Sequence, residues 1–211
     1  MRFAKILSVL LFGLVAGVAP AMAEDFKEGV NYELVVPPQP TNTGDKVEVL
    51  ELFWYGCPHC FRFEPFVERW LEKKPAQAEF VRMPAIFRAE WEPHARAYYT
   101  GQIMGVFDKV HRPLFNAIHQ EKRTLDNETQ LRDFYGEHGV NKDEFTKTYN
   151  SFAVETRVGR AKMMVGRYGI DGVPAVIVNG KYRVSAKTAG GNAEMLKVID
   201  FLVAKESVKS K

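Results

Sequence analysis

The sequence predicts an α/β protein whose sheet is interrupted by an inserted all-helical subdomain. Strand-like runs occupy residues 47–55 and 79–84, and further strand-like runs follow at residues 175–184. Between them, residues 88–168 carry apolar side chains at helical spacing. Neither set of strands alone makes a stable sheet, so we expect both sets to join in one sheet.

The N-terminus has the three parts of an export signal. Arg2 and Lys5 supply a short basic region, residues 6–18 are mostly apolar, and the A-x-A sequence at 21–23 matches a cleavage site. The apolar run is too short to span a bilayer, which argues against a membrane anchor. We therefore expect residues 1–23 to be a cleaved signal peptide and the rest of the chain to be exported to a compartment where disulfides persist.

The charge balance gives no support to a nucleic-acid partner. Residues 1–23 hold two of the 29 basic residues and none of the 26 acidic ones, so the chain that follows has 27 basic and 26 acidic residues. Its net charge is +1, and the sequence has no basic stripe with interleaved aromatic residues. We expect no nucleic-acid partner, and we expect a monomer.

The first part of the predicted fold spans residues 24–87. Residues 37–44 form a proline-containing loop, and residues 47–55 are mostly apolar on both faces, which is typical of a central strand covered on each side. Gly56 then turns the chain, and Pro58 suits the first position of a helix. The helix carries apolar side chains three and four residues apart, which predicts a buried face: Phe63, Phe66, Val67, Trp70 and Leu71.

Residues 88–168 form the predicted helical subdomain, and residues 169–211 complete the sheet. Asn179-Gly180 between two short apolar runs predicts a β-hairpin with a type I′ turn. A helix over residues 192–204 follows, and we expect residues 205–211 to be a solvated tail. The last helix of the subdomain has a regular apolar stripe that Gly169 ends: Val154, Val158, Ala161, Val165 and Tyr168.

The only two cysteines, Cys57 and Cys60, lie three residues apart at the predicted start of a helix. At this spacing their Cα atoms lie within the ~4.4–6.8 Å that a disulfide needs, so the bond can open and close without moving the backbone. A C-x-x-C pair between a strand and a helix is typical of a thioredoxin-type redox centre. With the intervening Pro58 and His59, this pair is the predicted catalytic site.

Three other roles fit the cysteines less well. A structural disulfide is common in exported proteins, but so short a loop would stabilise the fold by only about 2 kcal/mol. A zinc site needs four ligands, and haem attachment needs a histidine where the sequence has Phe61. We therefore expect neither a metal nor a cofactor. The remaining histidines show no ligand spacing and are expected on helix surfaces: His94, His111, His119 and His138.

The chain resembles the DsbA family of periplasmic thiol:disulfide oxidoreductases over essentially its whole length after residue 23. The segments that carry the resemblance are FWYGCPHC at 53–60, NSFAV at 150–154 and GVPAVIVNGKY at 172–182. The resemblance implies a thioredoxin fold with a helical insertion, a periplasmic location and the donation of disulfides to reduced exported client proteins. It also implies re-oxidation by a quinone-linked membrane protein.

The two cysteines are expected to have different roles. Cys57 is the exposed sulfur that a client thiolate attacks, and Cys60, one turn deeper, is the resolving thiol. A stable Cys57 thiolate favours the reduced enzyme and makes the oxidised enzyme a strong oxidant. The helix N-terminus contributes at most about 2 kcal/mol, whereas lowering a pKa by ~4 units needs about 5.5 kcal/mol. We therefore expect His59 to be the second contributor.

Two further positions are candidates for the site. Glu51 interrupts the apolar central strand, where an unpaired charge is costly. It either pairs with Arg82 on the next strand or exchanges a proton with Cys60, and both roles stay open. The Val173-Pro174 bond would by frequency be trans, but the resemblance implies a cis bond in a loop beside the cysteines. A strand edge there would pair with an extended client through main-chain hydrogen bonds.

Other activities remain as alternatives. A periplasmic thiol reductase or a disulfide isomerase would use the same cysteine pair, although the additional dimerisation domain of an isomerase is not expected here. A peptide-binding chaperone with an incidental disulfide is the alternative that is not an enzyme. Replacing both cysteines separates these classes, because a chaperone keeps its activity and an oxidase loses it.

Overall fold

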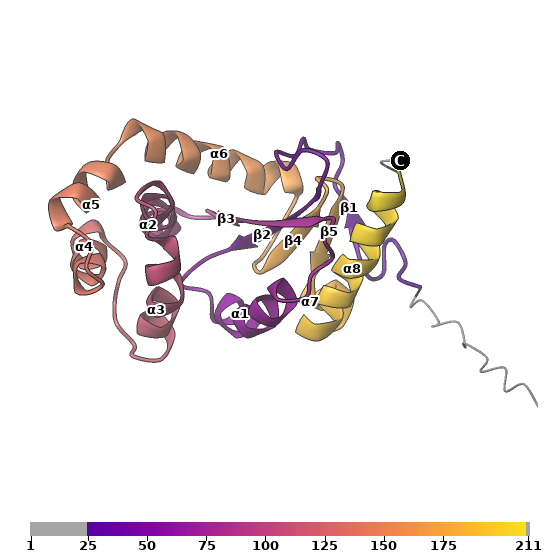
Figure 1. The fold of residues 1–211 in the computed structure, drawn as a ribbon, viewed down its shortest axis with the longest axis horizontal. Coiled ribbons are helices and arrows are strands. Elements are labelled where there is room, and N and C mark those ends of the chain that lie inside the picture. The colour runs from indigo at the N-terminus through magenta and orange to yellow at the C-terminus, as the bar shows by residue number, and fades with distance from the viewer. Residues whose placement is uncertain (1–24, 210–211) are drawn as a thin grey trace, which may run out of the picture.

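The computed structural model describes residues 25–209, which form a five-stranded sheet with helices on both faces (Figure 1). In space the strand order is β1-β5-β4-β2-β3; β2 and β3 are parallel, and the other neighbours are antiparallel. This arrangement confirms the predicted fold class. The predicted signal peptide, residues 1–23, lies outside the described residues. The strands are β1 (Glu33–Leu34), β2 (Val47–Phe53), β3 (Ala78–Pro84), β4 (Ala175–Val178) and β5 (Tyr182–Ser185).

β2 is the central strand, and every one of its residues is buried. On one face of the sheet, Val49 packs with α1 (Pro58–Leu71) and α8 (Asn192–Lys209). On the other face, Leu52 packs with α6 (Phe152–Tyr168). Figure 1 shows α6 above the strands and α1 below them, with α8 along the right-hand side. The strand is two residues shorter than the apolar run 47–55, because the chain already turns towards α1 there.

The helical block lies between β3 and β4 in the sequence and extends from one end of the sheet (Figure 1). Its inward side chains form one apolar cluster with Phe53, Tyr55 and Cys57, so the block packs directly on the cysteine end of the sheet. Before α6 it contains a 3₁₀ turn (Ala89–Trp91), α2 (Glu92–Ile103), α3 (Phe107–His119), α4 (Glu128–Glu137) and α5 (Lys142–Tyr149); a short α7 (Ala186–Ala189) follows the hairpin.

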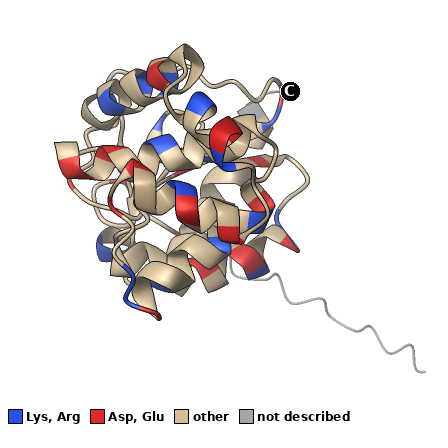
Figure 2. Cartoon of the chain, turned by 90° about the vertical axis from the view of Figure 1, so that its left-hand side faces the viewer, with Lys and Arg blue, Asp and Glu red and all other residues tan. Residues whose placement is uncertain are grey.

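Charged residues of both signs alternate over the end of the molecule that the helical block forms (Figure 2). Several are paired: Arg123 lies 2.8 Å from Glu137, and Lys142 lies 2.8 Å from Asp133. Exposed pairs of this kind contribute roughly 0–1 kcal/mol each. The face that Figure 2 shows therefore has no extended field of one sign.

The C-terminal segment is not the solvated tail predicted for residues 205–211. α8 continues through most of it, and Glu206 is only 1 % exposed. The Glu206 carboxylate accepts hydrogen bonds at 2.8 Å from Tyr182 and Asn179, and a further one from Lys181. Burial alone would raise the pKa of Glu206, but these three donors lower it to about 2. This carboxylate ties the last helix to the hairpin.

Two histidines that were expected on helix surfaces are buried. His94 and His111 are each 6 % exposed. His94 Nε2 lies 2.8 Å from the Leu125 carbonyl oxygen, and His111 Nδ1 lies 2.8 Å from the Tyr55 hydroxyl. Burial lowers the pKa of His94 to about 4 and that of His111 to about 3, so both are neutral at pH 7. The other two are half-buried: His119 and His138.

The hairpin between β4 and β5 has the predicted type I′ turn. Asn179 and Gly180 both adopt left-handed conformations, with φ of 51° and 65°. The Lys181 N–H donates to the Val178 carbonyl at 3.0 Å and closes the turn.

Gly180→Ala is expected to lower the stability of the protein by about 2 kcal/mol or more. A Cβ at this position would lie 1.9 Å from the Gln39 carbonyl oxygen, and the positive φ disfavours any side chain. Gly44 has a similar φ of +61°, and a Cβ built there would meet no atom within 4 Å. Gly44→Ala therefore measures the cost of the positive φ without a steric clash. Thermal unfolding should show the larger loss for Gly180→Ala, and equal losses would contradict a role for the contact with Gln39.

Candidate active site

The two cysteines lie where β2 turns into α1. Cys57 is the N-cap residue, with φ −87° and ψ 116°, and Pro58 follows at the first helical position. The Cys57 N–H donates to the Trp54 carbonyl oxygen at 2.9 Å, which closes the turn. Both cysteines are free thiols; Cys57 is 7 % exposed and Cys60 is fully buried. Cys57 is therefore the more accessible of the two sulfurs.

The pKa of the Cys57 thiol is lowered from 9.0 to about 6. The largest cause is the hydrogen bond from the Cys60 thiol, and burial opposes it. The backbone N–H groups of Cys60 and His59 at the start of α1 lower the pKa further, followed by the charge of His59. Cys60 itself is thus the principal partner of the Cys57 thiolate, a contribution that the sequence analysis missed.

The pKa of the Cys60 thiol is shifted in the opposite direction, well above 9.0. Burial is the largest cause, and the hydrogen bond to Cys57 and the charge of Cys57 add to it. The negative charge of Glu51 acts in the same direction. One sulfur of the pair is therefore stabilised as a thiolate, and the other is held as a thiol.

The His59 side chain is exposed at the start of α1, next to Arg62. Its Nδ1 lies 2.9 Å from the Arg62 guanidinium. His59 contributes less to the low pKa of Cys57 than the Cys60 thiol does. The sequence analysis ranked His59 as the second contributor to the low pKa of Cys57, which overestimated its share.

The loop before β4 lies against the redox pair. The Val173-Pro174 peptide bond is cis, as the resemblance implied, and the Cys57 thiol donates to the Val173 carbonyl oxygen at 3.3 Å. A second cis bond, Val36-Pro37, was not expected from the sequence. A pocket of about 300 Å³ lies beside this loop, and His59, Val173 and Pro174 are among the residues that line it.

Glu51 is fully buried in β2. Arg82 Nε, on the neighbouring strand β3, donates to its Oε2 at 2.9 Å, so the predicted ion pair is present. Its Oε1 has no hydrogen-bond partner among the described residues. Burial raises the pKa of Glu51 to about 7; Arg82 and His111 oppose this shift, and the nearby Glu64 adds to it. Both protonation states of Glu51 are thus accessible near neutral pH.

The sequence is similar to a known protein family and to proteins of that family. Residues 81–199 match the DSBA-like thioredoxin domain family. The thiol:disulfide interchange protein DsbA of Pseudomonas aeruginosa is 42 % identical over 211 residues and covers 100 % of both chains. The DsbA of Burkholderia cepacia is 40 % identical over 202 residues, which cover 94 % of this chain and 95 % of that protein. The chain belongs to the DsbA family. It is a thiol:disulfide oxidoreductase.

Solved structures of other DsbA-family proteins share the fold. The crystal structure of Pseudomonas aeruginosa DsbA has a TM-score of 0.84 and 43 % identity, covering 89 % of this chain and 98 % of that one. The oxidoreductase NmDsbA1 of Neisseria meningitidis has a TM-score of 0.76 and 27 % identity, covering 87 % and 95 %. The thioredoxin fold with a helical insertion is therefore confirmed.

This DsbA-family chain has two further buried polar groups that the sequence analysis did not place at the site. Glu64, on α1, is 1 % exposed and accepts a hydrogen bond from Arg82 at 3.1 Å. His111 Nε2, on α3, lies 3.4 Å from Glu64 Oε1. Glu64 lies four residues after Cys60 and three before Val67, on the apolar face of α1. This spacing could have indicated from the sequence that its carboxylate is buried.

The described part of this DsbA-family chain shows no metal site and no membrane span. Within it, no group of three or more His, Cys, Asp or Glu side chains is arranged to hold a metal ion. None of its helices is long and apolar enough to cross a membrane.

Proposed function

We propose that this DsbA-family protein donates its Cys57–Cys60 disulfide to reduced proteins that have been exported to the periplasm. The observation that carries the proposal is the opposite shift of the two thiol pKa values, to about 6 for Cys57 and well above 9.0 for Cys60. The sulfur that leaves easily is also the more exposed one. Export is part of the proposal and relies on residues 1–23 acting as the signal peptide.

The proposed reaction has two exchange steps. A client thiolate attacks the Cys57 sulfur of the oxidised enzyme, which breaks the Cys57–Cys60 bond and releases the Cys60 sulfur with its electron pair. A second client thiolate then attacks the client sulfur of the mixed disulfide, and Cys57 leaves as a thiolate. The client loses two electrons and gains a disulfide, and the enzyme ends as the dithiol. The low pKa of Cys57 favours this last departure.

Glu51 is proposed to supply the proton that Cys60 takes up when it is released. The raised pKa of Cys60 means that this sulfur leaves as a thiol rather than as a stable thiolate. Glu51, with a pKa of about 7, carries a proton in part of the population at pH 7 and can take it back during re-oxidation. Arg82 cannot do this, because a guanidinium stays protonated in proteins.

The loop at Val173 and Pro174 is proposed to hold the client backbone. When Cys57 is protonated, the Val173 carbonyl accepts its S–H. The disulfide form has no such donor, so this carbonyl becomes free to accept a backbone N–H from an extended client. The adjacent pocket, lined by His59 and Pro174, leaves room for client side chains. Main-chain recognition of this kind explains tolerance of many client sequences.

Cys60→Ser is expected to accumulate mixed disulfides with clients that already carry a disulfide. The Cys57 thiolate attacks one sulfur of the client disulfide, the other leaves as a thiolate, and the Cys60 thiol that would release the client is gone. Cys57→Ser should trap far less, since Cys60 is fully buried and its thiol is not stabilised as a thiolate. Non-reducing gels with mass spectrometry of the linked peptides measure both. Equal trapping by the two variants would contradict the assignment of Cys57 as the attacked sulfur, and retained activity in the double variant would favour a chaperone.

Rapid re-oxidation of the reduced protein is expected only where an external acceptor takes its two electrons. We propose a quinone-linked membrane oxidase as this partner, docking around Cys57, His59 and the Pro174 loop. Reduced protein mixed with bacterial membranes should regain its disulfide quickly when quinone is present and slowly when quinone is extracted. The same rate with and without quinone would argue against this partner.

A further inference from the structure

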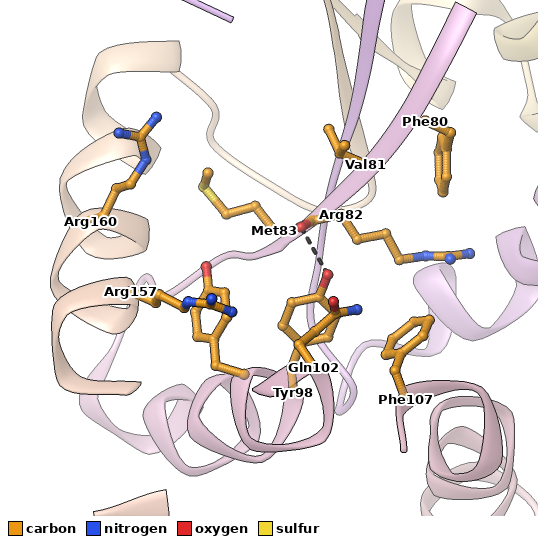
Figure 3. Close-up of a pocket in the computed structure, with 10 residues that line it drawn as sticks. Phe80, Val81, Arg82, Met83, Tyr98, Gln102, Phe107, Arg157 and Arg160 are labelled. Carbon is orange, nitrogen blue, oxygen red and sulfur yellow. Dashed lines mark hydrogen bonds between the residues drawn. The ribbon is translucent and has the colours of Figure 1, made fainter. Parts of the chain in front are cut away.

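A second pocket, of about 420 Å³, lies away from the cysteines, where the helical block meets the edge strand β3. None of the residues that line it belongs to the C-x-x-C segment or to the cis-proline loop. Figure 3 shows Arg157 and Arg160 reaching from α6 on one side and Phe107 of α3 on the other, with Met83 of β3 and Gln102 of α2 between them. Its volume is within the range of about 300–1,000 Å³ that is usual for small-molecule sites.

One part of this pocket is apolar. Val81 and Met83 of β3 and Phe107 of α3 line it and are only partly buried in the surrounding core. Tyr98 of α2 closes the space between them, and its hydroxyl is already used, because it donates to the Arg82 carbonyl oxygen at 3.0 Å. An alkyl or aryl group placed here would remove apolar surface from water.

The opposite part of the pocket is positively charged. Arg157 and Arg160 lie one turn apart on α6, both are exposed, and neither forms a hydrogen bond or ion pair with any other described residue. The third arginine of the lining, Arg82, is already neutralised by Glu51 and Glu64. The charge of Arg160 lowers the pKa of the buried Glu48. Two guanidinium groups are thus left to pair with an anion.

We propose that this pocket binds a small single-chain amphiphile with a carboxylate head, of which a medium-chain fatty acid is the simplest case. The carboxylate would pair with the planar guanidinium forks of Arg157 and Arg160, which match its geometry. The chain would lie over Val81, Met83 and Phe107. Because the ligand contacts both β3 and α6, binding would also stabilise the junction between the sheet and the helical block. This site is independent of the disulfide chemistry proposed above.

Decanoate below its micellar concentration is the probe, with titration calorimetry and the methyl NMR signals of methionine as the two measurements. Decanoate is expected to bind and to shift the Met83 methyl signal, which Met83→Leu identifies by its loss. Decyltrimethylammonium has the same chain with the opposite charge and should not bind. Arg157→Gln combined with Arg160→Gln should weaken decanoate binding at least ~10-fold, as expected for the loss of charge-assisted hydrogen bonds.

Two matched variants decide where the ligand sits. Arg167→Gln removes an exposed arginine of the same helix that does not line the pocket, so it should leave binding unchanged. Gln102→Trp fills the mouth of the pocket from an exposed position on α2 and should abolish binding. All of these variants should keep the melting temperature of the parent protein. No binding of decanoate, equal binding by the double arginine variant, or shifts confined to the surroundings of Cys57 would each overturn the proposal.

Discussion

Replacing Arg82 by methionine is expected to lower the free energy of unfolding by about 3–5 kcal/mol, as removal of one partner from a buried ion pair typically does. For a protein of this length the loss corresponds to a melting temperature lower by on the order of 10 °C. Arg82 is held between the rings of Phe80 and Phe107 and neutralises two carboxylates, Glu51 at 2.9 Å and Glu64 at 3.1 Å. Methionine keeps much of the packing volume but leaves both carboxylates without their cation.

The pH dependence distinguishes this electrostatic effect from simple loss of packing. Burial already raises the pKa values of Glu51 and Glu64 in the parent, and the charge of Arg82 lowers them. Without Arg82 both pKa values rise further, so protonation of the two carboxyls relieves more of the penalty at pH 5 than at pH 8. As the pH rises above 4.5, the ordinary pKa of both groups, the carboxyls ionise in the unfolded chain but stay protonated in the fold, so the penalty grows until the pH reaches the new folded values. Calorimetry at pH 5 and pH 8 should therefore give the larger loss at pH 8.

The matched control adds Glu51→Gln and Glu64→Gln to Arg82→Met. If uncompensated charge causes the loss, this triple variant should recover most of the stability at pH 8. Arg82→Lys should lie between the parent and Arg82→Met, because it keeps the charge but not the planar fork that reaches both carboxylates. A triple variant as unstable as Arg82→Met, or a loss that is the same at both pH values, would contradict this account.

The parts of the site that could be predicted from the sequence depend on local spacing. Cys57 and Cys60 are three residues apart, Pro58 is a suitable first helical residue, and Asn179-Gly180 specifies its turn by its own conformational preferences. Glu51 could be singled out because it interrupts an apolar strand. In each case the signal lies within a few residues, so tertiary contacts were not needed to recognise it.

The parts that were missed depend on contacts between distant segments. His111 contacts Tyr55 and Glu64 because α3 packs on α1. No residue near His111 in the sequence indicates these contacts. Glu206 was placed in a tail because its neighbours are charged, although the hairpin supplies three donors to it. The role of Cys60 in lowering the pKa of Cys57 depends on the orientation of two side chains, which spacing alone does not determine.

The relative stability of the two redox forms is expected to reverse with pH. The folded pKa of Cys57 is about 6 and its ordinary value is 9.0, so it is a depressed pKa. The stabilisation of the reduced form is fully present above pH 9, about 4 kcal/mol at ~1.4 kcal/mol per unit, and is lost as the pH falls through 6. At pH 7 about 1.4 kcal/mol remains. Oxidation removes the thiolate, and the short-loop disulfide stabilises the oxidised form by about 2 kcal/mol because it constrains the unfolded chain.

The stabilisation of the reduced form by the Cys57 thiolate and that of the oxidised form by the disulfide are equal at pH ~7.5. The oxidised protein should therefore melt at the higher temperature at pH 5, and the reduced protein should melt at the higher temperature at pH 8.5. The raised pKa of Cys60 opposes the reduced form only above about pH 9, where this thiol would ionise in the unfolded chain. Other titrating groups, such as Glu206, are present in both forms and cancel to first order.

Matched calorimetry of both forms at pH 5, 7 and 8.5 tests the reversal directly. His59→Ser should move the crossing to slightly higher pH, because His59 makes only the smallest of the favourable contributions to the Cys57 thiolate. The variant with both cysteines replaced by serine should show no dependence on added reductant. If the oxidised form melts higher at every pH, the thiolate is not stabilised as the structure indicates, and a reductase becomes the better description. If the reduced form melts higher even at pH 5, the disulfide must strain the fold, and the loop-entropy contribution is wrong.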